Sequence, residues 1–453
     1  MKLLPDHLAA GRIANSTNLS QQGLAMVSEP SPAETAPVDA LVVGLGYIGL
    51  PTAAVIARSG LKVRGIDISE PVVTTINEGR VHIEEANLDE VVRQVVADGR
   101  LTASLAPCRA GVFLIAVPTP FGPGHQPDVS YVMAAVRKIA PMLAAGNCVI
   151  LESTSPIGTT HQIAELIAQL RPDLAVPGHC EGRAPDLAIA YCPERVLPGR
   201  ILIELIDNDR VIGGITPECA VRAAGFYRRF VKGDCVETTA RAAEMVKLVE
   251  NSFRDVNIAF ANELSVIAEG LGIDVWEVIR LANRHPRVNI LQPGPGVGGH
   301  CIAVDPWFLV ASDPANARLI RTAREVNDGK ADYVADKAKA LLAAMPEARV
   351  ACLGLAFKPN IDDFRESPAL DIVRRLATGH GPRLNVVEPF AQRLPDDLAT
   401  LGATHCTLEE ALDACEIVLV LVDHDAFKSA DPARLAGKVV YDTRGMWSQV
   451  KRA

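Results

Sequence analysis

Short apolar runs alternate with longer amphipathic stretches between residues 40 and 215, and this alternation predicts strands followed by helices. Because a helix-sized stretch separates most of these runs, a parallel sheet covered by helices is the expected outcome. The predicted strands are Ala40 to Val43, Lys62 to Ile66, Val112 to Val117, Cys148 to Leu151, Leu187 to Tyr191 and Arg210 to Ile212.

A different pattern begins at Thr239, where apolar residues recur every three or four positions as far as Leu271. This period predicts one amphipathic helix, about 45 Å long at 1.5 Å per residue. Its apolar stripe consists of Met245, Val249, Phe253, Val256, Phe260, Leu264, Ile267 and Leu271. We expect so long a helix to link two domains and to form a contact between subunits, which predicts a homodimer or a higher homo-oligomer.

The alternation returns after Asn327-Asp328-Gly329, with a helical stretch expected over Ala331 to Ala344. The strands predicted beyond it are Arg349 to Leu353, Leu384 to Val387, Ile417 to Val422 and Lys438 to Tyr441. The predicted fold class is therefore α/β, with two Rossmann-like, doubly wound parallel-sheet domains joined by a long central helix.

Composition narrows the classes of function. A net charge of -9 argues against a general nucleic-acid binder. The longest apolar runs fall far short of the roughly 20 residues that a membrane span needs, so no membrane anchor is expected. Ten cysteines without metal-ligand spacing predict no metal site and favour a reduced, cytoplasmic setting. Residues 1–37 read as a disordered tail, within which Met26 is a candidate for the true start.

The first predicted strand runs into a glycine turn at residues 44–49, and the second strand ends at Asp67. This order of strand, glycine turn, helix, strand and acid is typical of a dinucleotide-binding fold. We expect Gly44 to make the turn, Gly46 to let the backbone reach a pyrophosphate, and Gly49 to let the helix pack closely. The carboxylate of Asp67 would accept ribose hydroxyls and repel a 2′-phosphate, so the predicted cofactor is NAD rather than NADP.

A loop rich in glycine and proline spans residues 283–308, where four residues of each type exclude a regular helix or strand through its middle. One thiol, Cys301, lies near its end, and a buried structural cysteine is the simpler alternative to a nucleophile. The loop residues that could assist a nucleophile or hold an anionic substrate are Asp305, His285, Arg287 and His300.

Polar residues elsewhere are further candidates. On the central helix, Lys247, Asn251 and Arg254 lie opposite the apolar stripe, although a solvated helix face is the simpler interpretation. Thr119 and Thr154 follow strand ends, which face the ligand crevice in a doubly wound sheet. In the second α/β unit, stacking and cationic contacts to a phosphorylated ligand could come from Phe357, Lys358, Arg365 and Arg444.

These motifs together resemble the nucleotide-sugar 6-dehydrogenase family, which includes UDP-glucose and GDP-mannose dehydrogenases. The resemblance covers about Ala40 to Met446. Its strongest stretches are Gly44 to Thr52, Ala116 to Phe121, Leu151 to Gly158, Tyr191 to Gly199, Glu244 to Glu263, Asn283 to Phe308 and Phe357 to Pro368. It implies an NAD-binding Rossmann domain at 38–215, a central helical domain with the cysteine loop at 216–330, and a UDP-sugar-binding Rossmann-like domain at 331–453.

The resemblance also implies a reaction and a set of site residues. The reaction is a four-electron oxidation of a sugar C6 alcohol to a carboxylate, with two NAD, one water and a cysteine thioester. The implied catalytic residues are Cys301, Lys247, Asn251, Asp305, Glu194 and Thr154. The implied cofactor contacts are Gly44, Gly46, Tyr47, Ile48, Gly49, Asp67, Thr119, Thr154 and Arg365. The implied substrate contacts are Arg195, Val196, Lys247, Asn251, Arg254, His285, Arg287, Gly298, Phe357, Lys358 and Arg444.

The segment His285 to Asn289 and the run Gly-Val-Gly-Gly-His-Cys depart from the pattern usual in UDP-glucose dehydrogenases. This departure favours an N-acetylhexosamine, and the resemblance favours UDP-N-acetyl-D-mannosamine over UDP-N-acetylglucosamine or UDP-glucose. Two further alternatives are a two-electron, NAD-dependent hydroxyacid dehydrogenase with a buried Cys301 and a non-catalytic nucleotide-sugar sensor. The hydroxyacid dehydrogenase gives no reason for a second nucleotide fold. The sensor would need the binding pockets but not Lys247 and Cys301 together.

Overall fold

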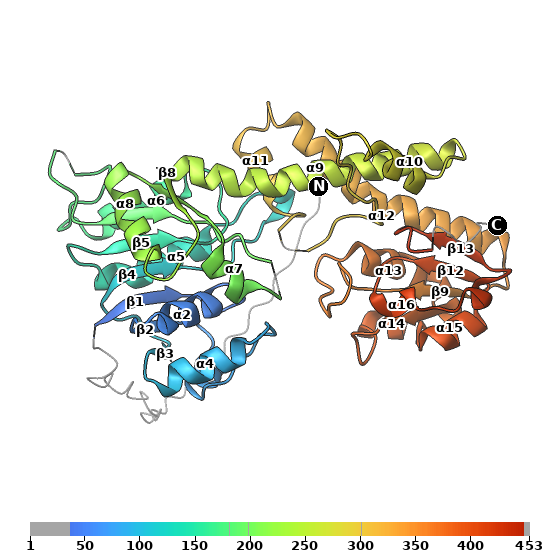
Figure 1. The fold of residues 1–453 in the computed structure, drawn as a ribbon, viewed down its shortest axis with the longest axis horizontal. Helices are drawn as coiled ribbons and strands as arrows, with labels where there is room; N and C mark the ends of the chain where they lie inside the picture. The colour runs from blue at the N-terminus through green and yellow to red at the C-terminus, as the bar shows by residue number, and fades with distance from the viewer. Residues whose placement is uncertain (1–36, 181, 198, 300, 448–453) are drawn as a thin grey trace, which may run out of the picture. The chain divides into compact units, whose positions relative to one another are not determined.

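A computed structural model describes residues 37–180, 182–197, 199–299 and 301–447 (Figure 1). The predicted tail, apart from residue 37, and His300 lie outside the described residues. Among the described residues, no helix is both long and apolar enough to cross a membrane.

The first sheet has eight strands in the order β3-β2-β1-β4-β5-β6-β7-β8. The strands are β1 Val38–Val43, β2 Val63–Ile66, β3 Leu101–Ser104, β4 Ala110–Ile115, β5 Cys148–Leu151, β6 Ala188–Tyr191, β7 Arg210–Gly214 and β8 Cys235–Thr239. All neighbouring strands are parallel except β6 and β7, which are antiparallel. The sequence did not reveal the edge strands β3 and β8, because both are short and carry polar residues. β8 extends the sheet beyond residue 215, where the first domain was predicted to end.

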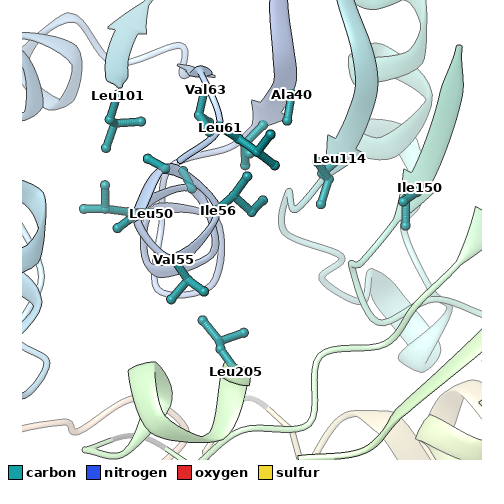
Figure 2. Close-up of a cluster of buried hydrophobic side chains, with 14 of the residues drawn as sticks. Ala40, Leu50, Val55, Ile56, Leu61, Val63, Leu101, Leu114, Ile150 and Leu205 are labelled. Atoms are coloured by element: carbon teal, nitrogen blue, oxygen red, sulfur yellow. The ribbon is translucent and has the colours of Figure 1, made fainter. Parts of the chain in front are cut away.

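Both faces of this sheet are covered by helices. They are α2 Gly49–Arg58, α3 Glu70–Asn77, α4 Leu88–Ala97, α5 Ser130–Ile139, α6 Thr159–Leu170, α7 Ile201–Asp207 and α8 Pro217–Tyr227, with short 3-10 turns at Pro123–His125 and Ala140–Met142. Successive residues of β1 enter opposite cores, because side chains alternate along a strand. In the core shown in Figure 2, Ile56 of α2 faces Val63 and Leu114 of the sheet, and Val55 faces Leu205 of α7.

The central part is helical. Its helices are α9 Ala240–Gly270, α10 Val275–Ala282, α11 Asp305–Ser312 and α12 Arg318–Ala344. α9 is the predicted long helix, and the Thr239 side chain caps it by accepting a hydrogen bond from the Ala242 backbone N–H. The expected helix start at Ala331 was wrong, because α12 begins 13 residues earlier and runs through Asn327-Asp328-Gly329. Asn327 is buried inside that helix and hydrogen-bonded to α9, so tertiary contacts outweigh the local turn preference of these residues.

The second sheet has five parallel strands in the order β11-β10-β9-β12-β13. The strands are β9 Val350–Leu353, β10 Leu384–Val387, β11 Thr404–His405, β12 Ile417–Val420 and β13 Val439–Asp442. The helices are α13 Pro368–His380, α14 Asp396–Thr400, α15 Leu408–Ala414 and α16 Asp425–Lys428, with 3-10 turns at Gly381–Arg383 and Pro432–Leu435. The predicted fold class, two doubly wound α/β domains joined by a long helix, is confirmed.

Candidate active site

The glycine turn after β1 has a separate physical reason for each glycine. Gly44 has a φ of +89°, and a Cβ there would lie 2.6 Å from the Ala116 carbonyl oxygen. A Cβ on Gly49 would lie 1.8 Å from the Gly44 carbonyl oxygen, so α2 can start here only with glycine. Around Gly46 there is no protein atom within 4 Å of such a Cβ. Gly44 and Gly49 therefore serve the fold, whereas the space beside Gly46 is open to a ligand.

The surroundings of this turn fit a dinucleotide. Asp67 accepts hydrogen bonds from the backbone N–H groups of Leu45 and Ser69, both at 2.9 Å, which orients its carboxylate at the end of β2. Ile48, the residue before α2, supplies no side-chain cap. Leu50 donates its N–H to the Gly46 carbonyl oxygen and Pro51 has no N–H, so Gly49 is the residue of this first turn whose N–H could meet a pyrophosphate. Tyr47 is 45% exposed beside the turn.

Two more predicted cofactor contacts lie where β4 and β5 end. The Thr119 hydroxyl donates a hydrogen bond to the Thr154 backbone oxygen at 2.5 Å, which ties the two strand ends together. From the second domain, the Arg365 guanidinium lies 5.7 Å from the centre of the Tyr47 ring. Arg365 is itself held by two hydrogen bonds to the Asp363 carboxylate. The second domain thus contributes a cation to the neighbourhood of the glycine turn.

Cys301 is exposed, and its backbone carbonyl accepts the N–H of Asp305 at 2.8 Å where α11 begins. The carboxylate of Asp305 is buried and accepts a hydrogen bond from the Asn251 side chain. Burial raises the pKa of Asp305 to about 6, against the opposing effects of Lys247 and Asn251. The pKa of the Cys301 thiol is also raised, first by desolvation by the surrounding chain and then by the charge of Asp305.

The group around Cys301, which contains Asp305 and Asn251, also includes Glu194 and Lys247. Glu194 lies three residues beyond β6 and is buried, and its pKa is raised chiefly by desolvation, while Lys247 acts in the opposite direction. The charge of Lys247 likewise lowers the pKa values of Cys301 and Asp305. The structure therefore brings together a thiol, two buried carboxyl groups, an amide and an ammonium, from the cysteine loop, the loop after β6, and α9.

The second domain touches the cysteine loop directly. A Cβ on Gly298 would lie 2.2 Å from the Glu366 carbonyl oxygen and 2.9 Å from the Phe357 Cβ, so the loop packs closely on the segment after β9. The Lys358 ammonium lies 5.8 Å from the centre of the Phe357 ring. Arg444 donates a hydrogen bond to the Pro293 carbonyl oxygen at 3.3 Å, and its Nε pairs with Asp423 at 2.8 Å.

The remaining predicted substrate residues lie in different settings. Arg195 pairs with Glu250 at 2.6 Å, and the half-buried Val196 donates its backbone N–H to the Glu194 carboxylate. Arg254, His285 and Arg287 are exposed. His285 accepts the Arg287 backbone N–H through Nδ1 at 3.3 Å. Within the described residues, no hydrogen bond or ion pair joins these three side chains to the group around Cys301.

Several polar residues that position the site were missed in the sequence. Glu244 of α9 is fully buried and accepts the backbone N–H groups of Gly158 and Thr160, which satisfies the N-terminus of α6 from another helix. A second buried group is formed by Glu152, Tyr227 and Arg210. Acids and arginines at helix starts and strand ends are common in sequences, so no local signal marks them.

A separate cavity of about 230 Å³ lies between α9, α10, α12 and β13. Lys330, Ser265, Trp276 and Tyr441 are among the residues that line it. Burial lowers the pKa of Lys330 to about 8. None of the predicted site residues lines this cavity, so it is distinct from the group around Cys301.

Family models match three consecutive parts of the chain. Residues 39–231 match the NAD-binding domain, residues 241–329 the central domain and residues 351–449 the UDP-binding domain of the UDP-glucose/GDP-mannose dehydrogenase family. The chain belongs to the UDP-glucose/GDP-mannose dehydrogenase family. The NAD-binding match contains the glycine turn and Asp67, the central match contains Lys247 and Cys301, and the UDP-binding match contains Phe357 to Lys358.

Named relatives in this family are similar over nearly the whole chain. The UDP-N-acetyl-D-mannosamine dehydrogenase of Salmonella typhi is 56% identical over 414 residues, covering 90% of this chain and 98% of that protein. The NDP-N-acetyl-D-galactosaminuronic acid dehydrogenase of Ralstonia nicotianae is also 56% identical, covering 90% and 96%. Among solved structures, the UDP-D-ManNAc dehydrogenase of Pyrococcus horikoshii matches with a TM-score of 0.79 at 38% identity, covering 90% and 96%. The chain is therefore an oxidoreductase of the UDP-sugar dehydrogenase kind, as the sequence predicted.

The two outer glycines of the turn should respond differently from the middle one. We expect Gly49→Ala to destabilise the protein, because its Cβ has no room beside the Gly44 carbonyl oxygen. Gly46→Ala should leave the melting temperature close to that of the wild type but weaken NAD binding at least about tenfold, a loss of about 1.4 kcal/mol. Thermal unfolding and NAD titration by calorimetry measure both quantities. Equal effects of the two substitutions on NAD binding by a folded protein would contradict this division.

Proposed function

We propose that this enzyme oxidises the C6 alcohol of UDP-N-acetyl-D-mannosamine to the carboxylate of UDP-N-acetyl-D-mannosaminuronate, with two NAD and one water. The product would serve as a precursor of cell-surface polysaccharide. The observation that carries the proposal is the setting of the Cys301 thiol, which shares its surroundings with Lys247 and Asp305 and lies on a loop packed against the UDP-binding domain.

The proposed first oxidation uses α9. NAD, bound at the glycine turn, would accept one hydride from C6 in each of the two oxidations. Lys247, with the amide of Asn251 beside it, would release its ammonium proton to solvent and, as the neutral amine, take the C6 hydroxyl proton as the aldehyde forms. Asn251 is also the residue that holds Asp305 in place through its hydrogen bond. One helical segment therefore supports both the acid/base step and the group next to the thiol.

The thiol then needs a proton acceptor, because its raised pKa keeps it protonated near neutral pH. Asp305, with a pKa of about 6, is ionised there and would take that proton. The sulfur of Cys301 would form a bond to C6, and Lys247 would return its proton to the carbonyl oxygen. Loss of the second hydride, with the proton passing back to Lys247, leaves a thioester on Cys301.

Hydrolysis of the thioester needs an oriented water. Glu194 would accept the proton of the water that attacks C6, next to Thr154 at the end of β5. The bond between C6 and sulfur would break, and Asp305 would return a proton to Cys301. This step needs Glu194 in its ionised form, so its rate should fall as the pH falls through the pKa of that group.

The proposed substrate site combines two parts of the chain. Phe357, Lys358 and Arg444 would hold the UDP moiety, since Phe357 lies against Gly298, the Lys358 ammonium lies near the Phe357 ring and Arg444 reaches the cysteine loop. Arg195 and Val196 would line the sugar side next to Glu194. The proposal also includes the exposed residues Arg254, His285 and Arg287 as substrate contacts.

A panel of UDP-sugars assayed with NAD tests the proposed function. We expect UDP-N-acetylmannosamine to give the highest kcat/KM and two NADH per sugar, and NADP to be a poor substitute because of Asp67. Because one relative at equal identity is named for an N-acetylgalactosaminuronic acid, UDP-N-acetylgalactosamine belongs in the panel beside UDP-N-acetylglucosamine and UDP-glucose. A different best sugar would overturn the proposed substrate, and one NADH per sugar would overturn the four-electron reaction.

Replacing the thiol separates the proposed mechanism from a two-electron dehydrogenase. Cys301→Ser should lose at least about a thousandfold in kcat, because an alkoxide forms less readily than a thiolate and its ester hydrolyses more slowly. Binding of UDP-sugar and NAD should persist, since the sulfur is not needed to hold either. Steady-state kinetics and calorimetry measure both effects. A near-normal rate would remove the thiol from the chemistry.

We also propose that the enzyme is a homodimer or a higher homo-oligomer formed through α9. In the single chain, much of the apolar stripe predicted for this helix remains on the surface, where it would be covered by a second copy. Its exposed members are Met245, Val249, Phe253, Phe260, Ile267 and Leu271. Phe253 is the most exposed of them, at 71%.

A charge on the stripe should dissociate the proposed oligomer. We expect Phe253→Asp to shift the protein to a monomer, because the carboxylate would have to be buried without a partner. The control is Leu401→Asp, which places the same charge at an exposed apolar position of the second domain. Light scattering after size-exclusion chromatography gives the masses. A monomeric wild type, or an unchanged mass for Phe253→Asp, would exclude an interface on this stripe.

A further inference from the structure

Residues 355–360, which follow the turn after β9, carry two of the proposed UDP contacts, Phe357 and Lys358. Phe357 packs on the cysteine loop at Gly298. Lys358 precedes Pro359, and a residue before proline is largely confined to extended backbone, so this segment is locally stiff. The places where its two ends are fixed therefore decide how the phenyl ring and the ammonium are presented.

Glu388, directly after β10, fixes the start of the segment. Its Oε2 accepts the backbone N–H of Leu355 at 2.6 Å and that of Ala356 at 3.2 Å, and its Oε1 accepts the N–H of Phe390 at 3.1 Å. The side chain is 2% exposed. Burial acts to raise the pKa of Glu388, but the contacts with His424 and with the backbone N–H groups hold it below its ordinary value. A buried carboxylate ion therefore holds the start of the segment.

His424, directly before α16, fixes the end of the segment. Its Nδ1 accepts the backbone N–H of Asn360 at 2.9 Å. Asn360 has a φ of +62°, which asparagine adopts more readily than most residues. The Asn360 amide also donates to Asp425 Oδ2 at 2.7 Å, and its oxygen accepts the Asp425 N–H at 3.0 Å. Three hydrogen bonds thus fasten the last residue of the segment to the start of α16.

The two residues that fix these ends also contact each other. His424 Nε2 lies 3.4 Å from Glu388 Oε2, the same oxygen that holds the start of the segment. The imidazole is fully buried, and its ring centre lies 5.2 Å from those of Phe390 and Phe427. Because Nδ1 accepts a hydrogen bond, the proton of the neutral ring is on Nε2 and faces the carboxylate. The carboxylate therefore orients the imidazole so that its lone pair meets the Asn360 N–H.

We propose that Glu388 and His424 are positioning residues for the UDP moiety, which fix both ends of residues 355–360 and so present Phe357 and Lys358 to the nucleotide. This inference rests on the UDP contacts of Phe357 and Lys358 given under Proposed function. Both positioning residues are buried, so they act through the segment rather than by touching the ligand. A segment that is already in place loses less conformational freedom on binding, so loosening either end should weaken UDP binding.

Three substitutions of His424 test this role. Asparagine places an amide oxygen near the position of Nδ1 and can still accept the Asn360 N–H, glutamine reaches toward Glu388 instead, and leucine does neither. We expect His424→Leu and His424→Gln to raise the Kd of UDP at least about fivefold, and His424→Asn to stay within about twofold of the wild type. Calorimetric titration with UDP alone measures these values. KM for the UDP-sugar should follow the same order, while kcat changes by less than about threefold.

Hydrogen exchange followed by mass spectrometry measures the two fixed ends without any ligand. The Leu355 and Asn360 N–H groups are bonded to Glu388 and His424, which slows their exchange with solvent. Peptides that cover residues 355–360 should exchange faster in His424→Leu and His424→Gln than in the wild type and in His424→Asn. Exchange that is equally fast in all three variants would show that the acceptor at Nδ1 does not hold the segment, and would overturn the inference.

The matched control is His405→Leu, because His405 Nε2 lies 3.4 Å from the backbone oxygen of Glu388 rather than from its carboxylate. A second control is Leu398→Ala, which opens a cavity in the core of the same domain and lowers its thermal stability. Neither should change the Kd of UDP or the exchange of residues 355–360. If the His424 variants do not fold, Glu388→Gln decides the question, since glutamine has one oxygen for N–H groups that now meet two.

Glu388→Gln should raise the Kd of UDP and speed the exchange of residues 355–360. A lower melting temperature with a normal Kd of UDP, in this variant or in His424→Leu, would show a purely structural role and overturn the inference.

A Lys358→Met variant separates the inference from the proposed UDP site. It removes the ammonium but leaves both ends of the segment fixed, so it should weaken UDP binding without faster exchange. If Lys358→Met binds UDP as tightly as the wild type, the proposed nucleotide contact fails and the inference fails with it. If Lys358→Met weakens UDP binding but His424→Leu does not, only the role of Glu388 and His424 is overturned.

Discussion

The arrangement of the site depends on one buried ion pair between α9 and α12. Arg324 donates to the Asp255 carboxylate at 2.6 Å, and both side chains are almost fully shielded from water. Asn327 donates to the same carboxylate and accepts a hydrogen bond from Asn262, whose oxygen in turn takes the backbone N–H of Gly294 in the cysteine loop. Because a buried charge left without its partner costs about 3–5 kcal/mol, this network fixes the two helices and the loop relative to each other.

That constraint explains how groups distant in sequence meet. Lys247 and Asn251 lie on α9 before Asp255, and Cys301 lies on the loop that begins beyond α10. α12 leads from the ion pair into the second sheet, from which Phe357 and Arg444 reach back to the loop. Taken alone, each residue of the buried network around Asp255 and Arg324 is an ordinary polar residue. Together they place the thiol, the ammonium and the UDP-binding domain at one site.

The two α/β domains share one local arrangement, a glycine turn after the first strand beside an acid at the end of the neighbouring strand. In each, a glycine with positive φ follows the first strand, and an acid at the end of the neighbouring strand accepts the next backbone N–H: Leu45 to Asp67 and Leu355 to Glu388. Beside Glu388, however, the fully buried His424 lies 3.4 Å from the carboxylate. Glu388 therefore has a side-chain partner within its own domain, whereas the hydrogen bonds that Asp67 accepts in the described part of the chain come from backbone N–H groups.

The sequence by itself determined most strands of the two sheets, though not the edge strands β3, β8 and β11, together with the length of α9, the glycine turn with Asp67, and the family. These features follow from local periodicity and from the backbone freedom of glycine, and both depend only on residues close together in the sequence. Only the tertiary structure decided the direction of β7, the continuity of α12 and the polar partners Asp255, Arg324 and Glu152. The direction of a strand and the partners of a buried ion pair depend on which segments, distant in sequence, contact each other in the fold. The cost of burying a charge is offset only when its charged partner is brought next to it.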